Sequence, residues 1–450
     1  MGLALALEQQ GVPTAPVSTH VFARLAKATA LAAGMPTVRN VFVPQPVVGR
    51  SPTELRAYID GTDPVLKRPF MQGVIEGLTG PLDAEDLKGA TFERSTPRLL
   101  PPDTEDNLRQ LFMENRWTDF LPIMLPTEER VAQMLKGSKQ PPGRIVGRMR
   151  PTAFREAWEF DVEKVAVNSV MAGARPEYLP VVLAMASTGI SARSSSTTSW
   201  ATISLVNGPI RNELGMNSGI GAMGPYNHAN ATIGRAFALT SQNVQGGSVP
   251  GETYMGTLGN WLNYTACFPE AEERSPWTPF HVDHGFKATD STVTVFFGGW
   301  YTQSGFGPRE TWQNRFRRML VATDFYSPPI IVMDPLVARS FVDLGFTKRS
   351  LIEWCAANAK LPARDYWDDQ WTTTLIKPLA VAGVEPYASR LKAAPDDLID
   401  IFTPEDIKIV VTGGETQGGF KMLSGRYFGR GPGTSILGNN KPTVNIDDWR

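Results

Sequence analysis

The sequence predicts a mixed α/β fold, in which a partial doubly wound parallel-sheet piece precedes a larger domain of mixed α/β and α+β character. Two observations predict it. Short apolar runs alternate with stretches of helical periodicity, and Pro-containing connections near residues 92 and 150 divide the chain. Alternation of this kind favours parallel strands joined by helices. The resulting parts are a partial α/β domain, a helical connector and a main domain, at residues 1–92, 93–150 and 151–450.

The first part reads as the back half of an α/β unit. A β-type run at residues 12–17 leads into a helix over residues 20–33, and a second strand follows at residues 40–43. Because the sequence opens directly on an apolar helix, we expect the front half of the unit to be missing or supplied elsewhere. A two-stranded sheet is marginal alone in water. The rest of the chain, a second copy or a different polypeptide should therefore cover its edge.

Helix starts are marked clearly in the first two parts. Ser51, followed by Pro52 and by Glu54 three positions on, forms the pattern of a capping box. In the connector, helices are expected at residues 104–115 and 128–136. Pro- and Gly-containing stretches flank them on both sides.

The main domain combines strands and helices whose order in the sheet cannot be derived from sequence. Strands are predicted at residues 199–206, 291–297, 329–333 and 407–411. Helices are predicted at residues 156–171, 176–187, 229–240, 335–344 and 350–359. The Gly-rich C-terminal tail, residues 413–450, is expected to form turns and short strands that pack onto this body.

The composition limits the classes of partner. The 450 residues carry 44 Lys and Arg against 45 Asp and Glu, so no excess of positive charge favours nucleic acid or an anionic membrane surface. No run approaches the roughly 18 apolar residues of a membrane span. Two cysteines, Cys267 and Cys355, form no disulfide framework. We therefore expect a cytoplasmic protein that acts on small molecules or binds other proteins.

Residues 207–235 form a Gly- and Asn-rich segment between a strand and a helix. It contains a GxGxxG pattern at Gly219, Gly221 and Gly224, but the distance from the strand and the lack of a following acidic residue argue against a dinucleotide. Gly and Asn permit left-handed backbone and can direct N–H groups at an anion. We expect an anionic substrate group here, clamped by Arg235. The alternative is a structural loop whose Asn side chains cap its own backbone.

Residues 267–284 hold a thiol and several carboxylates close together. A thiolate beside an imidazolium is an activated nucleophile, which makes Cys267 a candidate catalytic residue. Glu270 and Glu272 are the candidate acid–base groups. The alternative is a surface loop of solvated acids in which Cys267 is inert packing.

The same segment ends in His281, Asp283 and His284. Neutral imidazole and carboxylate bind divalent metals, so a metal site is predicted at these three residues. Their spacing matches no standard zinc pattern. Another candidate pair, Arg175 and Glu177, stands at a helix start. Either these two side chains line a pocket with the Gly/Asn-rich segment, or they form an N-terminal capping and dipole arrangement.

Four stretches together resemble the UGSC-motif family of selenoprotein-like proteins. They are LEQQGVPTAPVSTHVF, RPEYLPVVLAM, NGPIRNELGMNSGIGAMGPYNHANATIGRA and LGNWLNYTACFPEAEERSPW, at residues 7–22, 175–185, 207–236 and 258–277. The resemblance implies a pocket in the main domain built from Arg175, Glu177, Asn207, Asn217, Asn230, Arg235, Cys267, Glu270 and Glu272. It also suggests a thiol-dependent redox or bond-cleaving reaction, as in an oxidoreductase or a lyase.

The sequence departs from the family pattern at its N-terminus. The family takes its name from a turn of selenocysteine or cysteine, Gly, Ser and Cys, expected just before the first helix, and neither cysteine of this sequence lies in such a turn. We therefore expect a hetero-oligomer in which a separate chain supplies the turn and this chain supplies the pocket. A wrongly assigned start and a loss of redox function are the competing explanations. A noncatalytic scaffold or binding subunit and a metal-dependent hydrolase are the alternative functions.

Overall fold

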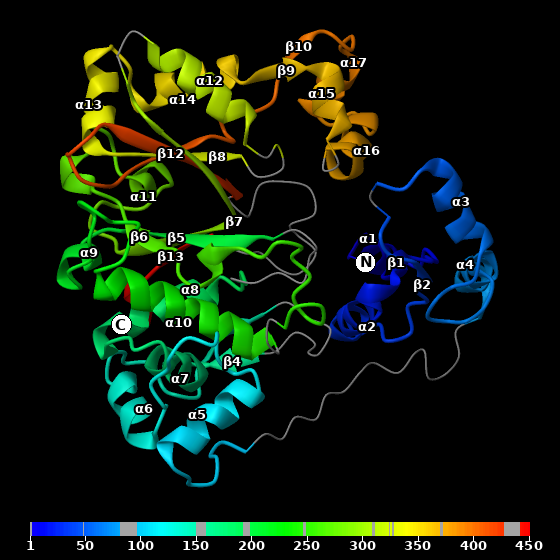
Figure 1. The fold of residues 1–450 in the computed structure, drawn as a ribbon, viewed down its shortest axis with the longest axis horizontal. Coiled ribbons are helices and arrows are strands. Elements are labelled where there is room, and N and C mark those ends of the chain that lie inside the picture. Colours follow the sequence, from blue (N-terminus) through cyan, green and yellow to red (C-terminus); the bar gives the residue numbers. More distant parts are fainter. Residues whose placement is uncertain are drawn as a thin grey trace.

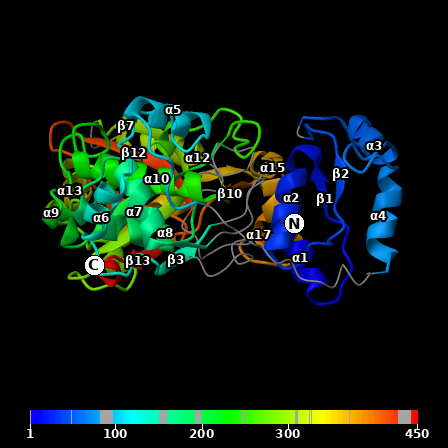
Figure 2. The ribbon, with the colours of Figure 1, turned by 90° about the horizontal axis from the view of Figure 1, so that it is seen from below.

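The computed structural model describes residues 2–47, 49–81, 97–149, 159–191, 199–245, 249–307, 311–323, 325, 328–369, 372–426 and 442–450. The mixed α/β prediction is confirmed, since helices and both parallel and antiparallel strands alternate along the chain. Figures 1 and 2 show residues 2–81, the N-terminal unit, at one end of the molecule. The remaining described residues form the sheet domain. No helix among the described residues has the length and apolarity needed to cross a bilayer.

The N-terminal unit is a parallel two-stranded sheet with helices around it. Its elements are α1 (Gly2–Glu8), β1 (Val17–Thr19), α2 (Ala23–Ala32), β2 (Val41–Val43), α3 (Pro52–Asp60) and α4 (Phe70–Thr79). β1 pairs in parallel with β2, which confirms the predicted parallel piece. The side chain of Asp63 accepts the Phe42 N–H at 2.7 Å. Ser51 and Glu54 form the predicted capping box at the start of α3.

This unit has a small core. One apolar cluster of this unit holds Val41, Val43 and Phe70, with Tyr58 and Val74 packed against them. The other buried apolar side chains in its described part are those of Leu5, Phe42, Ala26, Ala28 and Ala30. Burying one such side chain fully contributes about 1.5–3 kcal/mol, so a core of this size supplies little stability by itself. Among the described residues, β1 and β2 pair with no further strand.

A seven-stranded mixed sheet organises the sheet domain. Its strands are β5 (Ala201–Asn207), β6 (Cys267–Pro269), β7 (Thr292–Gly305), β8 (Pro329–Met333), β11 (Lys408–Val411), β12 (Gly419–Arg426) and β13 (Thr443–Asn445). They follow the order β11-β8-β12-β7-β5-β6, with β13 also paired to β7. The pairs β5/β6 and β8/β11 are parallel, and the other pairs are antiparallel.

The sheet curls so that its two outer strands meet. The N–H of Ala271, just after β6, donates to the Val411 carbonyl of β11 at 2.7 Å, and Thr412 Oγ1 donates to the Pro269 carbonyl at 2.8 Å. One apolar cluster on the inner face contains residues from all six strands of the main path. The C-terminal ends of β6 and β11 are thereby brought together at one rim.

Helices cover the outer face in two groups (Figure 1). One group packs over β5, β6 and β7 and consists of α7 (Val162–Met171), α8 (Leu179–Ser187) and α10 (His228–Gln245). The other packs over β8, β11 and β12 and consists of α12 (Trp312–Val321), α13 (Pro335–Asp343) and α14 (Lys348–Asn358). Both outer-face clusters are rich in aliphatic and aromatic side chains, so the strands are buried on two sides.

The helices of the predicted connector belong to the first group's core. α5 (Glu105–Glu114) and α6 (Glu128–Leu135) contribute Phe112, Val131 and Met134 to the cluster that contains α7 and α8. A short antiparallel pair, β3 (Ile145–Arg148) with β4 (Glu159–Asp161), spans residue 151. Packing therefore does not separate residues 97–149 from the rest of the sheet domain.

Two smaller groups of elements complete the fold. α9 (Ile210–Glu213) and α11 (Phe280–Asp283) lie at the rim of the sheet. β9 (Lys360–Pro362), α15 (Ala363–Asp368), α16 (Lys377–Val381), α17 (Tyr387–Lys392) and β10 (Leu398–Asp400) form a peripheral lobe in which β9 and β10 pair antiparallel.

The Gly-rich tail contains a strand that the sequence does not reveal. β12 lies between β7 and β8, so it is an internal strand of the sheet and not a short appended one. Its register shifts between Ser424 and Gly425, and a Cβ at Gly425 would press on the end of the Ile330 side chain. Glycine eases the close approach of the strands there, and its presence masks the strand pattern. Residues 427–441, also in the predicted tail, lie outside the described residues.

Candidate functional site

A buried polar cluster occupies the rim where β5 and β6 end. Because parallel strands end at the same edge of a sheet, Asn207 and Glu270 are neighbours there. Asn207 Nδ2 donates to Glu270 Oε2 at 2.5 Å and to Glu272 Oε1 at 2.9 Å. The Gly208 N–H donates to the same Glu272 oxygen at 2.7 Å. Three of the predicted site residues are thus brought together.

Glu270 is the most deeply buried carboxyl of this cluster, with 1 % of its surface exposed. Besides Asn207, it accepts the Phe280 N–H at 2.8 Å. Burial raises the pKa of Glu270, and it outweighs the opposing effects of the Lys348 charge and of the two hydrogen bonds. A carboxyl in this setting holds a proton at higher pH than an exposed one.

Arg211, on α9, neutralises the cluster and is the residue that sequence reasoning missed. It is buried, and its Nη2 lies 3.0 Å from Glu272 Oε2 and 2.9 Å from Glu273 Oε1. Nη1 also donates to the Glu270 carbonyl at 2.7 Å. These contacts hold the pKa of Glu273 down at about 2. Pro209 before a short helix was the available signal, since it places Arg211 one turn beyond the end of β5.

His281 lies behind the cluster with no exposed surface. Its Nδ1 is 3.9 Å from Glu272 Oε1, which is too far for a hydrogen bond. Burial lowers the pKa of His281, and the Glu272 carboxylate only partly opposes this effect. Because its pKa lies below the ordinary value of 6.5, the imidazole is neutral at pH 7.

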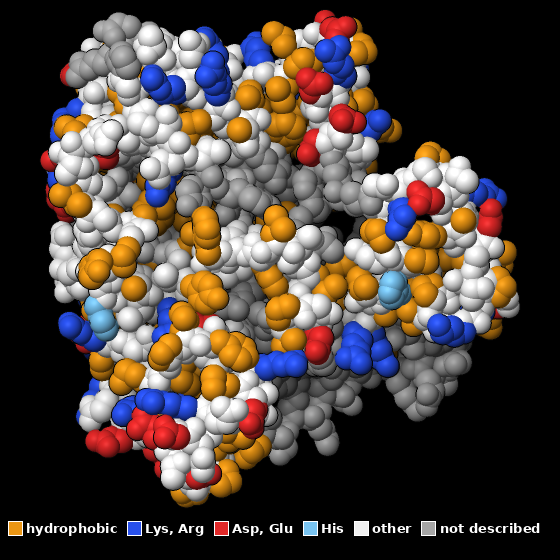
Figure 3. All heavy atoms as spheres, viewed as in Figure 1, with side chains coloured by type: hydrophobic (Ala, Val, Ile, Leu, Met, Phe, Trp, Pro, Cys, Tyr) orange, Lys and Arg blue, Asp and Glu red, His pale blue; other side chains and the backbone are white. Residues whose placement is uncertain are grey.

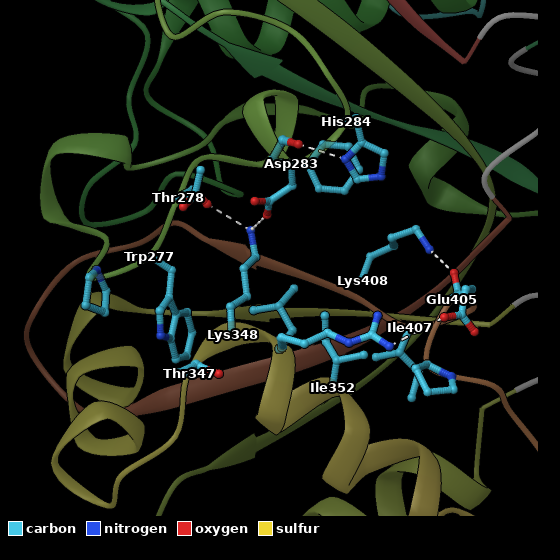
Figure 4. Close-up of a pocket in the computed structure, with 15 residues that line it drawn as sticks. Trp277, Thr278, Asp283, His284, Thr347, Lys348, Ile352, Glu405, Ile407 and Lys408 are labelled. Atoms are coloured by element: carbon cyan, nitrogen blue, oxygen red, sulfur yellow. Dashed lines mark hydrogen bonds and ion pairs between the residues drawn. The ribbon is translucent and has the colours of Figure 1, made fainter.

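A cleft of about 840 Å³ opens on the other side of α11 (Figure 4). Its polar lining comes from α11, the start of α14 and the segment before β11. In Figure 4, Lys348 points toward Asp283 and the Thr278 carbonyl, which its Nζ contacts at 2.5 and 3.0 Å. Trp277 and Ile352 are among the apolar lining residues. A cleft of this size, lined by apolar and charged side chains, falls in the size range of small-molecule sites.

His284 lines this cleft and is held in one orientation. Its ring stacks on Phe280 with centroids 4.0 Å apart, and its Nδ1 lies 2.8 Å from the Phe280 carbonyl oxygen. Because a carbonyl only accepts hydrogen bonds, Nδ1 carries the proton in this contact. Burial lowers the pKa of His284, and the positive charges of Lys408 and Lys348 add to the effect.

Phe280 connects the two sides of the site. Its N–H bonds Glu270 in the buried cluster, its carbonyl bonds His284, and the residue lines the cleft. A ligand that moved α11 would therefore act on both groups. The buried cluster and the cleft are thus linked through the backbone of Phe280.

The predicted nucleophile lies apart from the acids. Cys267 belongs to the apolar cluster under α10, while Phe268 belongs to the inner cluster, as strand alternation requires. Burial raises the pKa of Cys267 to about 12 and also raises that of Cys355. Neither thiol is a thiolate at neutral pH. Cys267 is buried in an apolar cluster, as the alternative of inert packing expects.

The Asn residues of the Gly/Asn-rich segment hold the segment itself. Asn230 Nδ2 donates to the carbonyls of Asn217 and Ala222 at 2.9 and 3.0 Å. Asn217 Oδ1 accepts the Gly219 N–H at 2.8 Å, and Asn217 Nδ2 donates to the Ile220 carbonyl. These bonds satisfy the loop backbone, which is the structural alternative considered from the sequence.

Arg235 is engaged away from the cluster. It forms a two-point ion pair with the buried Asp119, with N–O distances of 2.9 and 2.8 Å. Arg175 and Glu177 are exposed at the start of a 3-10 turn, next to the buried Tyr178. In the described part of the chain, none of these three side chains contacts the Asn207–Glu270 cluster, because each belongs to the helical layer outside the sheet.

The predicted metal ligands do not converge. His281 faces Glu272, Asp283 pairs with Lys348, and His284 is bonded to the backbone of its own short helix. Within the described ranges, no group of three or more His, Cys, Asp or Glu side chains is arranged to hold a metal ion. Their spacing along a helix of four residues directs the side chains to different sides.

Comparison with known proteins finds a family match for one part of the chain. Residues 2–69 match the model of the UGSC family. No curated protein and no solved structure matches the chain. The match ends just before α4, so the polar cluster and the cleft lie outside it. The resemblance to the UGSC family is therefore confirmed, and residues 2–69 carry the assignment.

Proposed function

We propose that this chain is a subunit of a small-molecule enzyme of the UGSC family and that it holds a polar, anionic substrate in the cleft beside α11. The observation that carries the proposal is the charge of the cleft. Among the lining residues, the cations Lys348, Arg349 and Lys408 exceed the acids Asp283 and Glu405 by one charge. Arg349 also pairs with Glu353 beside the lining, and His284 is neutral because its pKa is lowered. An excess of positive charge in a partly desolvated cleft attracts anions.

The chemistry proposed for the assembled enzyme is thiol-dependent redox or bond cleavage, with the reactive thiol on a separate polypeptide. The burial and the raised pKa of Cys267 and Cys355 support this division, because a reactive thiol must be accessible and ionised. Glu270, which is bonded to the N–H of the cleft residue Phe280, has a raised pKa. This carboxyl would allow the chain to supply or accept a proton.

Anion binding can be tested without the natural substrate. Succinate and inorganic phosphate, titrated separately by calorimetry, are expected to bind the wild-type chain, and Lys348→Gln should weaken the affinity at least tenfold. Lys360→Gln is the matched control, because Lys360 also pairs with an aspartate but lies in the peripheral lobe. Equal affinities in the two variants would remove the cleft from the proposal.

The second polypeptide is tested by native mass spectrometry of the chain co-expressed with the products of adjacent genes. A stable mixed complex is expected. A chain that binds anions in the cleft yet never forms a mixed complex would be a binding subunit without the proposed thiol chemistry. That noncatalytic role is the second candidate, and the burial of both thiols is the observation that favours it.

A further inference from the structure

A large exposed apolar surface surrounds the first half of α10. On one side of the helix, Arg235 holds the segment of Phe120 and Leu121 through Asp119 and the Leu121 carbonyl. On the other side, Thr265 Oγ1 donates to the Ala231 carbonyl. Tyr264 is the residue directly before Thr265 in the sequence. Figure 3 shows hydrophobic side chains gathered over the region where Figure 1 places α10.

Four aromatic side chains contribute most of this surface, which we call the α10 surface. Their exposed fractions are 67 % for Phe120, 104 % for Tyr226, 70 % for Trp261 and 47 % for Tyr264. Leu121 is also exposed. An aromatic side chain carries about 150–250 Å², so these four leave on the order of 600 Å² of apolar area in water. Exposed patches of this size mark interaction sites in soluble proteins.

Two of the aromatic residues also adopt an unusual backbone. Phe120 and Tyr226 have φ angles of 65° and 70°. A bulky residue in this region is strained, and such strain is found where a side chain serves a function. Both residues therefore present an aromatic ring to solvent at a local cost in backbone energy.

We infer that the α10 surface is the interface with a second copy of this chain. A standard interface buries about 800 Å² on each partner, somewhat more than half of it apolar. The exposed aromatic area alone meets that need. Interfaces of this kind between identical chains are most often two-fold symmetric, with the same patch on both partners.

The charges around the surface favour a copy of the same chain over a charged partner. Arg235 is paired with Asp119, and Arg116 lies 3.2 Å from Glu252 at the edge of the surface. Each charge is neutralised within its own chain. Two identical surfaces can therefore meet without like-charge repulsion, whereas a strongly charged partner would find no complement here.

The experiment uses the full chain. Sedimentation velocity at micromolar concentration is expected to give a dimer, and the double variant Phe120→Asp/Trp261→Asp should raise the dissociation constant at least 100-fold. Val381→Asp/Leu398→Asp is the matched control, because these side chains are 73 % and 65 % exposed in the peripheral lobe. Since all four positions are exposed, both variants should keep the circular dichroism spectrum of the wild type.

Cysteine cross-linking locates the contact. Both native thiols are buried, so new cysteines at Phe120, Tyr226 and Trp261 can be oxidised one at a time without background. At least one of them should give a disulfide-linked dimer, and Val381→Cys should not. A wild-type monomer at 100 μM, a dimer that survives the double aspartate variant, or association only with a different polypeptide would each overturn the inference.

Discussion

The N-terminal unit and the sheet domain differ in how much of their structure each can support alone. The sheet domain buries its strands between two helical layers and around an inner apolar cluster. The N-terminal unit has two short strands and one buried cluster of three apolar side chains. The family match lies on the unit with the smaller core, whereas the cleft and the polar cluster lie on the domain with the larger one. The family match and the candidate chemistry thus lie in separate regions.

The largest expected effect compares the two cores directly. Phe341→Ala in the sheet domain and Phe70→Ala in the N-terminal unit each remove a buried ring, which costs about 3–5 kcal/mol. In the sheet domain this should shift the global unfolding transition. In the N-terminal unit, the free-energy cost of Phe70→Ala should exceed the stability of the unit. Hydrogen exchange should then show residues 2–80 unprotected while the sheet strands stay protected.

If Phe70→Ala lowered the protection of both regions equally, the two regions would unfold as one cooperative body. That result would break the comparison. The conservative change Phe70→Leu is the control for shape, and it should retain most of the protection in the N-terminal unit.

The next effect concerns the charge that balances the polar cluster. Arg211→Ala leaves Glu272 at the rim without its guanidinium partner, and breaking a buried pair costs about 3 kcal/mol or more. Urea unfolding of the sheet domain measures it. Arg364→Ala is the control, because its pair with Asp396 is exposed and should change stability by about 1 kcal/mol or less. Equal losses of unfolding free energy in the two variants would show that the Arg211–Glu272 pair contributes no more than an exposed ion pair.

A smaller loss is expected in the Gly/Asn-rich segment. Asn230→Ala removes two donated hydrogen bonds and one accepted from the Asn217 N–H at 3.2 Å. Leaving these buried groups unpaired should cost about 1–3 kcal/mol. If the residue instead serves mainly to bind substrate, thermal unfolding of the variant would match that of the wild type.

The smallest effect is a change in the pH dependence of stability. Because the pKa of Glu270 lies above its ordinary value of 4.5, the folded chain binds this proton more tightly than the unfolded one. Its contribution to stability therefore falls as pH rises above 4.5 through the folded pKa. Glu270→Gln keeps an acceptor for Asn207 and Phe280, so its melting temperature relative to wild type should increase from pH 4 to pH 8.

Glu273 supplies a control of opposite sign. Arg211 lowers its pKa to about 2, so its contribution is present above pH 4.5 and is lost as pH falls toward 2. Glu273→Gln should lose stability at neutral pH and approach the wild type in acid. A Glu270→Gln difference that stays constant with pH would mean that this carboxyl is already ionised in the folded chain.

Sequence reasoning succeeded where a local rule has one outcome. The capping box at Ser51 and the parallel pairing of the first two strands follow from short-range patterns. The family resemblance selected Asn207 and Glu270, which meet where β5 and β6 end, although β6 itself was not predicted. Sequence reasoning failed where the partner of a side chain is distant in sequence, as for Arg235 and Asp119, which are 116 positions apart.

The sequence by itself determined the mixed α/β class, the capping box at Ser51 and the family resemblance, because these depend on periodicity, capping and motif residues. Only the tertiary structure decided that β12 is internal, that Cys267 faces α10 and that Arg211 completes the acidic cluster. The physical reason is that a side chain's direction and burial depend on which strands become neighbours. Burial in turn sets whether a thiol or carboxyl can carry charge.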